Sequence, residues 1–189
     1  MSYSNKILEL IDAVKVIDKI TDKEWKKGLS DRKTKELEFH DRDRDEKFEQ
    51  ETITNSDTYE KFYGNRKYYR AAKRSKIYVQ DWINRESKGK IFLDYACGNG
   101  DYAIHACKSG AALALGFDIS GTSIKNATKF AEKENLKINK ENGICFFQAD
   151  AENTKLPDSC IDTVICSGML HHLDLSYAFP ELRRILKPN

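Results

Sequence analysis

The feature of this sequence that most constrains its fold is the alternation, after Gly89, of short apolar runs with amphipathic segments. Such alternation is typical of β-α-β units, which place strands side by side in a parallel sheet. The expected strands are 90–96, 112–117, 144–148 and 161–166, and the expected helices are 100–108, 120–135 and 175–186. Because crossover connections are right-handed, these elements predict an α/β fold built on a doubly wound parallel sheet.

The first part of the chain has a different character. Residues 1–88 are polar and helical in pattern, so the sequence predicts a helical N-terminal extension ahead of a domain of residues 89–189. Residues 5–20 carry one apolar stripe at helical spacing, which must dock on the main domain or on a second subunit. The stripe consists of Ile7, Leu10, Ile11, Val14 and Ile17.

The rest of this extension is dominated by charged and aromatic residues. Residues 31–50 are almost wholly charged, which predicts a solvated helix or a mobile loop. Aromatic residues return in 58–84, which predicts one or two helices broken near Gly64 and Asn65.

Composition limits the location and the partners of the protein. No stretch approaches the roughly 18 apolar residues of a membrane span, and no signal peptide is evident, so a cytoplasmic location is expected. The net charge of +2 is too small for the whole molecule to bind a polyanion, and the basic run 66–76 has the pattern of a solvated helix face. Nucleic acid is therefore not expected as a partner. The five cysteines form no CxxC pair, which favours reduced thiols and predicts no metal site.

The ends of the expected strands collect carboxylates and glycines. In an open parallel sheet, ligands bind beyond the carboxyl ends of the strands. Asp94, Asp118 and Asp150 lie at three successive strand ends, and Gly98 and Gly100 form the turn that opens the next helix. Asp118 lies 18 residues beyond Gly100, which is about the interval at which an acidic residue reaches a ribose diol.

The glycine turn alone does not choose between cofactor classes, because residues 98–103 also satisfy the GxGxxG/A fingerprint of dinucleotide-binding proteins. Charge separates the two possibilities. A dinucleotide places an anionic pyrophosphate at the helix N-terminus, where the Asp94 carboxylate would repel it. S-adenosylmethionine carries a cationic ammonium and a sulfonium instead. The sequence therefore favours S-adenosylmethionine, with an NAD-dependent oxidoreductase as the alternative.

Together these motifs resemble the class I S-adenosylmethionine-dependent methyltransferases, particularly small-molecule enzymes of the ubiquinone and menaquinone biosynthesis type. The resemblance covers residues 89–189 and rests on DYACGNG, GFDIS, QADAENTKLPDSCIDTVICSGMLHHL and ELRRILKPN. It implies a Rossmann-like domain that transfers a methyl group from S-adenosylmethionine to a small-molecule acceptor by in-line displacement.

The sequence departs from the family pattern in two places. The family usually has glycine at the position of Ala96. Its chain also continues after a segment like LKPN, so this sequence is expected to be a fragment or to have lost its second half. A half-domain that binds a cofactor or a partner without turnover is therefore a third functional alternative.

The resemblance also assigns roles to the residues at the strand ends. Asp118 would hold the ribose hydroxyls, Ile119 would pack on the adenine face, and Asp150 and Ala151 would meet its amino edge. The first cofactor loop would consist of Asp94, Ala96, Cys97, Gly98 and Gly100. Ser167 and Gly168 would line the methionyl side of the cleft.

Candidates for contact with the methyl acceptor lie in two further segments. His171 and His172 follow the fourth strand, where either could accept a proton or position the substrate, with a structural role as the alternative. Related enzymes use N-terminal helices as a lid, which makes Tyr63, Tyr69 and Arg70 candidate lid residues.

The fourth strand itself has an apolar pattern that predicts burial, yet no following strand is present to pair with its outer edge. Such an edge invites pairing with another chain. We therefore expect either self-association through this edge or its coverage by the N-terminal helices.

Overall fold

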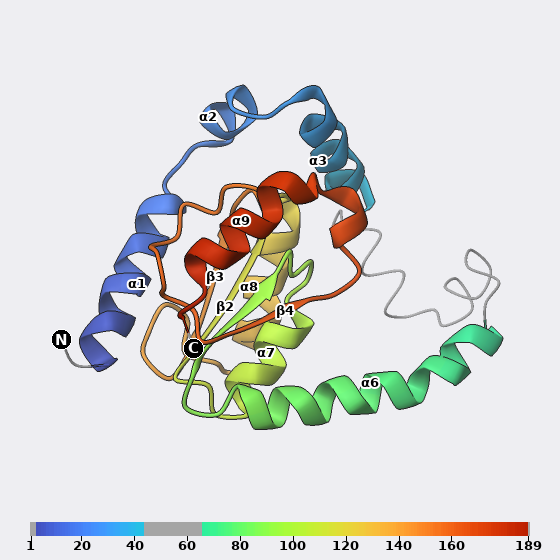
Figure 1. Ribbon diagram of the computed structural model, residues 1–189, viewed down its shortest axis with the longest axis vertical. Helices are drawn as coiled ribbons and strands as arrows, with labels where there is room; N and C mark the ends of the chain where they lie inside the picture. Colours follow the sequence, from blue (N-terminus) through green and yellow to red (C-terminus); the bar gives the residue numbers. More distant parts are fainter. Residues whose placement is uncertain (1–2, 44–65, 189) are drawn as a thin grey trace.

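A four-stranded parallel sheet forms the centre of the computed structural model, which describes residues 3–43 and 66–188. The strand order is β3-β2-β1-β4 (Figure 1). The strands are β1 (Ile91–Tyr95), β2 (Leu113–Asp118), β3 (Ile144–Gln148) and β4 (Thr163–Cys166). All three pairings are parallel, so the carboxyl ends of the strands meet at one edge of the sheet. The predicted doubly wound α/β fold is confirmed.

Helices cover both faces of this sheet. On one face, α7 (Asp101–Lys108) and α8 (Gly121–Lys133) follow β1 and β2, and α6 (Arg66–Glu86) joins them. On the other face lies α9 (Leu175–Ile185), which is preceded by the short 3-10 helix η1 (Leu170–His172). The elements expected from residue 89 onward begin and end within two residues of those observed. None of the described helices is long and apolar enough to cross a membrane.

The first helix, α1 (Tyr3–Ile17), is part of the core on the α9 face. All five residues of its predicted apolar stripe are buried, in one cluster with side chains of the strands such as Leu93, Leu115 and Phe147. The connection from β3 to β4, residues 149–162, contains no helix, and α1 packs against β3 on that face. The boundary at residue 88 stays a prediction, since α1 and the sheet share one core.

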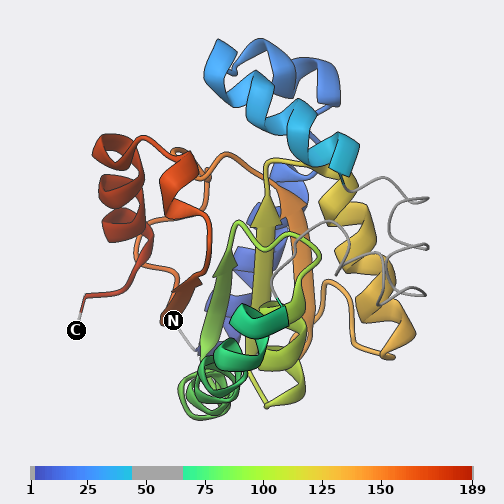
Figure 2. The ribbon, with the colours of Figure 1, turned by 90° about the vertical axis from the view of Figure 1, so that its right-hand side faces the viewer.

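Two shorter helices continue from α1 to the carboxyl edge of the sheet. Helix α2 (Asp22–Lys27) begins at a capping box formed by Thr21 and Glu24. Helix α3 (Asp31–Asp43) follows and lies above the carboxyl ends of the strands (Figure 2). The expected helix is present in residues 31–43, but it is not solvated on all sides, because Leu37 is only 2% exposed and ion pairs tie the helix to the strand ends.

Several expected features fall where the structure gives no description. Residues 44–50, Tyr63 and the expected helix break near Gly64 and Asn65 lie outside the described residues. Helix α6 begins at Arg66 and runs without interruption to Glu86.

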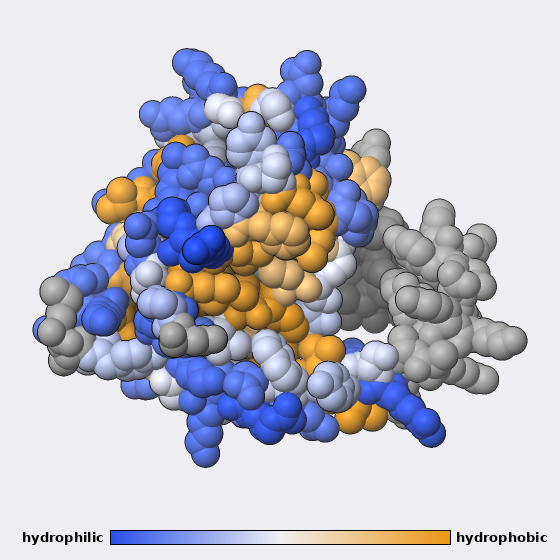
Figure 3. All heavy atoms as spheres, viewed as in Figure 1, coloured by the Kyte–Doolittle hydropathy of each residue, from blue (hydrophilic) through white to orange (hydrophobic). Residues whose placement is uncertain are grey.

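Strand β4 stands at the edge of the sheet. It is half-buried along its length rather than buried as expected, because β1 is its only ladder partner among the described strands. Apolar surface gathers where α9 and β4 lie (Figure 3), and Leu175 and Phe179 of α9 are 41% and 52% exposed. All five cysteines are free, as expected.

Candidate active site

A pocket opens at the carboxyl ends of the strands, beneath α3. Every strand contributes to its floor: Ala96 follows β1, Asp118 and Ile119 come from the end of β2, 149–152 follow β3, and 167–169 follow β4. It encloses about 740 Å³, including space open to solvent, which lies within the range of small-molecule sites. The strand order reverses between β1 and β4, so the pocket lies at the crevice where open α/β sheets bind ligands.

Asp118 is the acidic residue of this floor that the sequence placed at the ribose. Its side chain is 8% exposed. One carboxylate oxygen accepts the amide of Gly98 and the other accepts the amide of Ser120, both at 2.9 Å. A carboxylate can accept about four hydrogen bonds, so capacity for two more remains, which matches the two hydroxyls of a ribose.

Asp94 is placed differently. It is 3% exposed, and its carboxylate accepts the amide of Ala103 at 3.2 Å, in the first turn of α7. Burial raises its pKa to about 7. The side chain does not line the pocket. The charge argument against a pyrophosphate therefore weakens, because at neutral pH this carboxyl is partly protonated, and contact between Asp94 and a cofactor stays a prediction.

The first loop adopts the left-handed backbone conformations that a glycine turn requires. Gly98 and Gly100 have φ angles of 54° and 82°, and Ala96 has a φ of 58°. A Cβ on Gly100 would lie 2.5 Å from Cζ of Phe146, so this glycine allows the close packing of α7 on the sheet. Of the five loop residues expected at the cofactor, only Ala96 lines the pocket, whereas Asp94, Cys97, Gly98 and Gly100 do not.

At the end of β3, Asp150 and Ala151 both line the pocket. One oxygen of Asp150 accepts the amide of Glu152 at 2.9 Å, and the other accepts Nζ of Lys33 from α3. The Ala151 carbonyl accepts the hydroxyl of Tyr95. Lys33 thus occupies one carboxylate oxygen of Asp150, the residue that the family resemblance assigns to the adenine amino group.

Charged side chains of α3 form the roof of the pocket. Arg32 pairs with Glu152 and donates from Nη1 to the carbonyl of His172 at 2.6 Å. Lys33 pairs with Asp150 and Glu152. Burial opposes the charged form of Glu152, but hydrogen bonds from Lys33, the Asp174 amide and Arg32 outweigh it and lower its pKa. The roof is therefore held to the floor mainly by ion pairs.

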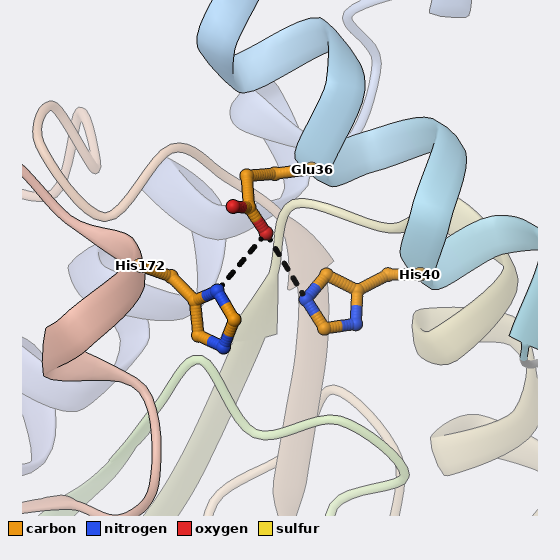
Figure 4. A group of neighbouring side chains, drawn as sticks. All are labelled: Glu36, His40 and His172. Carbon is orange, nitrogen blue, oxygen red and sulfur yellow. Dashed lines mark ion pairs between the residues drawn. The ribbon is translucent and has the colours of Figure 1, made fainter.

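The two histidines separate at the mouth of the pocket. His172 is half-buried and lines it, whereas His171 is exposed beside it. Nδ1 of His172 lies 3.1 Å from Oε2 of Glu36, and the same oxygen lies 3.7 Å from Nε2 of His40 (Figure 4). Ser167 and Gly168 also line the pocket, and their place on the methionyl side of a cofactor stays a prediction.

Sequence reasoning missed some residues of the pocket, and some of the residues it selected have side chains that the structure does not describe. No sequence motif singles out the roof residues Arg32, Lys33, Glu36 and His40, although Leu37 within this charged segment is a signal that one face of the helix is buried. Tyr69 and Arg70 belong to α6, but their side chains, like Tyr63, are outside the described residues, so their lid role stays a prediction.

Comparisons with known proteins agree with this geometry. A protein-family model described as "Methyltransferase domain" matches residues 93–189. The sterol 24-C-methyltransferase erg6 of Aspergillus fumigatus is 30% identical over 122 residues, which are 64% of this chain and 31% of that protein. The ubiquinone/menaquinone biosynthesis C-methyltransferase UbiE of Acidiphilium cryptum is 36% identical over 100 residues, 52% of this chain and 39% of that one.

Solved structures point to the same fold. The crystal structure of a putative S-adenosyl-L-methionine-dependent methyltransferase from Methanococcus maripaludis is 26% identical, with a TM-score of 0.52, and the likeness covers 59% of this chain and 50% of that one. The chain spans about a third of the length of the curated relatives named above. The family match covers half of the chain, and with the sheet order and the pocket it shows that this chain belongs to the methyltransferase domain family and has the Rossmann-like fold of the class I S-adenosylmethionine-dependent enzymes.

Proposed function

We propose that this chain binds S-adenosylmethionine in the pocket beneath α3 and that the enzyme transfers its methyl group to a small-molecule acceptor. The observation that carries the proposal is Asp118. This residue ends β2 inside a pocket to which all four strand ends contribute, and its carboxylate keeps room for two further hydrogen bonds. The family's cofactor carries a ribose diol that suits this acceptor.

The other floor residues fit the rest of the cofactor. Ile119 beside Asp118 offers an apolar surface for the adenine, and Asp150 and Ala151 lie at the adjacent strand end. Ser167 and Gly168, beyond β4, border the side where the methionyl group would extend. For adenine to use Asp150, its amino group must share or displace Lys33.

Methyl transfer asks little of the protein beyond placement. The sulfonium is a good leaving group, and holding the acceptor in line with the methyl carbon supplies much of the rate. Hydroxyl, amide and carbon acceptors also need a base. His172 lines the pocket and His171 does not, so His172 is the better candidate for this role.

The nature of the acceptor follows from the relatives only at the level of its class. The sterol and quinone-biosynthesis methyltransferases among them support a small molecule as the acceptor. Ribosomal protein L11 methyltransferases are also similar to this chain, so the titration with candidate acceptors must include a protein substrate. The cytoplasmic location and the absence of a nucleic-acid partner remain predictions from the sequence.

Calorimetric titration with S-adenosylhomocysteine, S-adenosylmethionine and NAD tests the proposal. S-adenosylhomocysteine should bind more tightly than NAD, and preferential NAD binding would support the oxidoreductase alternative. Asp118→Ala should weaken S-adenosylhomocysteine binding by about 1.5–3 kcal/mol, because hydrogen bonds to a charged acceptor have that range. Asp81→Ala on the exposed surface of α6 is the matched control and should bind as the parent chain does. Equal affinity in both variants would show that Asp118 only shapes the turn.

We further propose that the free edge of β4 mediates self-association. The strand has one ladder partner among the described strands, and apolar residues of α9 are exposed beside it. Light scattering over a concentration series should show a rising mass, with slowed hydrogen exchange at residues 163–166. A monomer with freely exchanging β4 amides would refute this.

A further inference from the structure

Three potential metal ligands converge at the mouth of the pocket, and none of them is explained by the binding of S-adenosylmethionine. Glu36, His40 and His172 each place one ligand atom so that all three atoms lie within 4.8 Å of one another. Glu36 and His40 are four residues apart on α3 and so share a helix face, while His172 comes from η1 (Figure 4). The cluster joins two distant parts of the chain.

The distances suit a tetrahedral ion. Zinc binds histidine nitrogen at 2.0–2.1 Å and carboxylate oxygen at 2.0–2.2 Å, so two ligand atoms at corners of a tetrahedron lie about 3.3–3.6 Å apart. Oε2 of Glu36 lies 3.1 Å from Nδ1 of His172 and 3.7 Å from Nε2 of His40. These two separations need adjustments of only a few tenths of an ångström. The nitrogens of His40 and His172 lie within 4.8 Å of each other, so binding an ion would also draw these two rings together to at most about 3.6 Å.

The chemistry and the charge of the surroundings also suit a divalent ion. Two histidines and one glutamate form a ligand set of zinc sites that keep a fourth position open. The three side chains are 25–34% exposed, so an ion could enter. The neighbouring cations Arg32 and Lys33 are both paired with carboxylates, which limits their repulsion of an incoming ion.

We propose that Glu36, His40 and His172 bind one divalent transition-metal ion, with Zn²⁺ as the best match, and that this ion fastens α3 to η1 over the pocket. Because all three residues line the pocket, the fourth position of the ion opens into it. Water or a donor atom of a pocket ligand would fill that position. The proposal concerns metal binding alone and does not depend on methyl transfer.

Metal binding by His172 and the general-base role proposed for it above are alternatives, and the metal titration decides between them. A ring nitrogen that ligates a metal cannot also accept a proton. If Nδ1 of His172 binds the ion as the geometry indicates, the general-base role at that atom is lost, and the structural interpretation of this histidine becomes a metal-binding one.

The test titrates the full chain, freed of metal by chelation, with Zn²⁺ and with Co²⁺ as a spectroscopic probe. We expect one Zn²⁺ per chain and the visible absorption of tetrahedral Co²⁺ without a thiolate-to-cobalt charge-transfer band. That band would instead assign binding to the cysteines and overturn the proposal. Failure to bind one ion per chain would also overturn it.

Variants locate the site. His40→Ala, His172→Ala and Glu36→Gln should each weaken Zn²⁺ binding at least tenfold. His171→Ala and Glu38→Gln are the matched controls, since His171 neighbours His172 and Glu38 is exposed on α3, and both should bind as the parent does. Unchanged affinity in the three ligand variants refutes the site, and if one variant fails to fold, the other two decide.

Hydrogen exchange tests the fastening of α3. Zn²⁺ should slow the exchange of amides in residues 31–43 in the parent chain and leave it unchanged in His172→Ala. Equal slowing in both would place the ion elsewhere.

Discussion

The floor of the pocket and its roof are held in place by different forces. In the floor and the first loop that adjoins it, Asp118 and Asp94 are nearly buried and accept hydrogen bonds from backbone amides, and Gly100 packs directly against Phe146. In the roof, one buried apolar residue, Leu37, is joined by ion pairs, in which the Arg32 side chain is 43% exposed but Lys33, Asp150 and Glu152 are only 6–17% exposed. The exposed Arg32 pair is screened by salt, and in the largely buried Lys33 pairs the cost of desolvation offsets much of the attraction, so each pair contributes little net free energy. The comparison suggests a preformed floor beneath a roof that is easily released.

The sharpest test of the rigid floor is Gly100→Ala. A left-handed conformation costs an alanine about 1–2 kcal/mol, and overpacking against the Phe146 ring costs about 1–3 kcal/mol more. The variant should therefore lose about 2–5 kcal/mol of unfolding free energy, measured by urea denaturation. Gly89→Ala, with a φ of 70° but nothing within 4 Å of its Cβ, should show only the conformational cost. If both lose the same amount, the floor is not tightly packed at Phe146.

A second test uses the buried carboxyl of Asp94, at the end of β1. The pKa of Asp94 is raised to about 7, above its ordinary value near 3.9. Between these two values the folded chain holds a proton that the unfolded chain has lost, so the unfolding free energy falls as the pH rises through that window. Asp94→Asn should abolish this fall, on the order of 2–4 kcal/mol between pH 4 and pH 8.

Urea denaturation at several pH values measures this difference. Asp81→Asn, an exposed position on α6, should keep the pH dependence of the parent chain. An unchanged slope in Asp94→Asn would mean that the carboxyl is ionised in the folded protein at neutral pH.

The roof is tested by Lys33→Met, which keeps the length of the side chain and removes its charge. This change should tighten S-adenosylhomocysteine binding about fivefold, roughly 1 kcal/mol, because Asp150 becomes free to accept the adenine amino group. Lys35→Met, on the exposed side of α3, should leave the affinity unchanged. Weaker binding in Lys33→Met would show that the roof stabilises the bound state more than Lys33 competes with it.

The smallest expected effect belongs to Ala96, where the floor carries backbone strain. Ala96→Gly removes a left-handed alanine, worth about 1–2 kcal/mol, and adds about 0.5–1 kcal/mol of chain entropy cost. The net result should be a stabilisation of roughly 0.5 kcal/mol in urea denaturation. Ala112→Gly, at a residue with ordinary backbone, should change stability in the opposite direction.

The same division explains what the sequence could predict. The floor follows a general rule, since parallel strands present their carboxyl ends at one edge, so Asp118, Asp150 and Ser167 could be assigned to the pocket from strand position alone. Strand position predicts which residues lie at the binding edge of the sheet, but it does not predict the direction in which each side chain points. Asp94 also ends a strand, yet its carboxylate accepts the α7 backbone and does not line the pocket.

The roof follows no local rule. Residues 31–43 have the charged composition of a solvated helix, and their partners Asp150, Glu152 and His172 come from the opposite end of the chain. Ion pairs between residues so far apart in the sequence depend on the tertiary fold, so no sequence pattern within α3 predicts them. The packing of Gly100 on Phe146 was hidden for the same reason.

The position of α1 has a consequence for how the protein is made. This helix leaves the ribosome well before the sheet, yet its apolar side is covered by β3 and the other strands, which are synthesised later. At about 5–20 residues per second, the stripe waits on the order of ten seconds before β3 exists. During that interval five large aliphatic side chains have no native partner. The nascent chain therefore exposes an apolar surface that can bind chaperones or aggregate with other chains translated from the same mRNA.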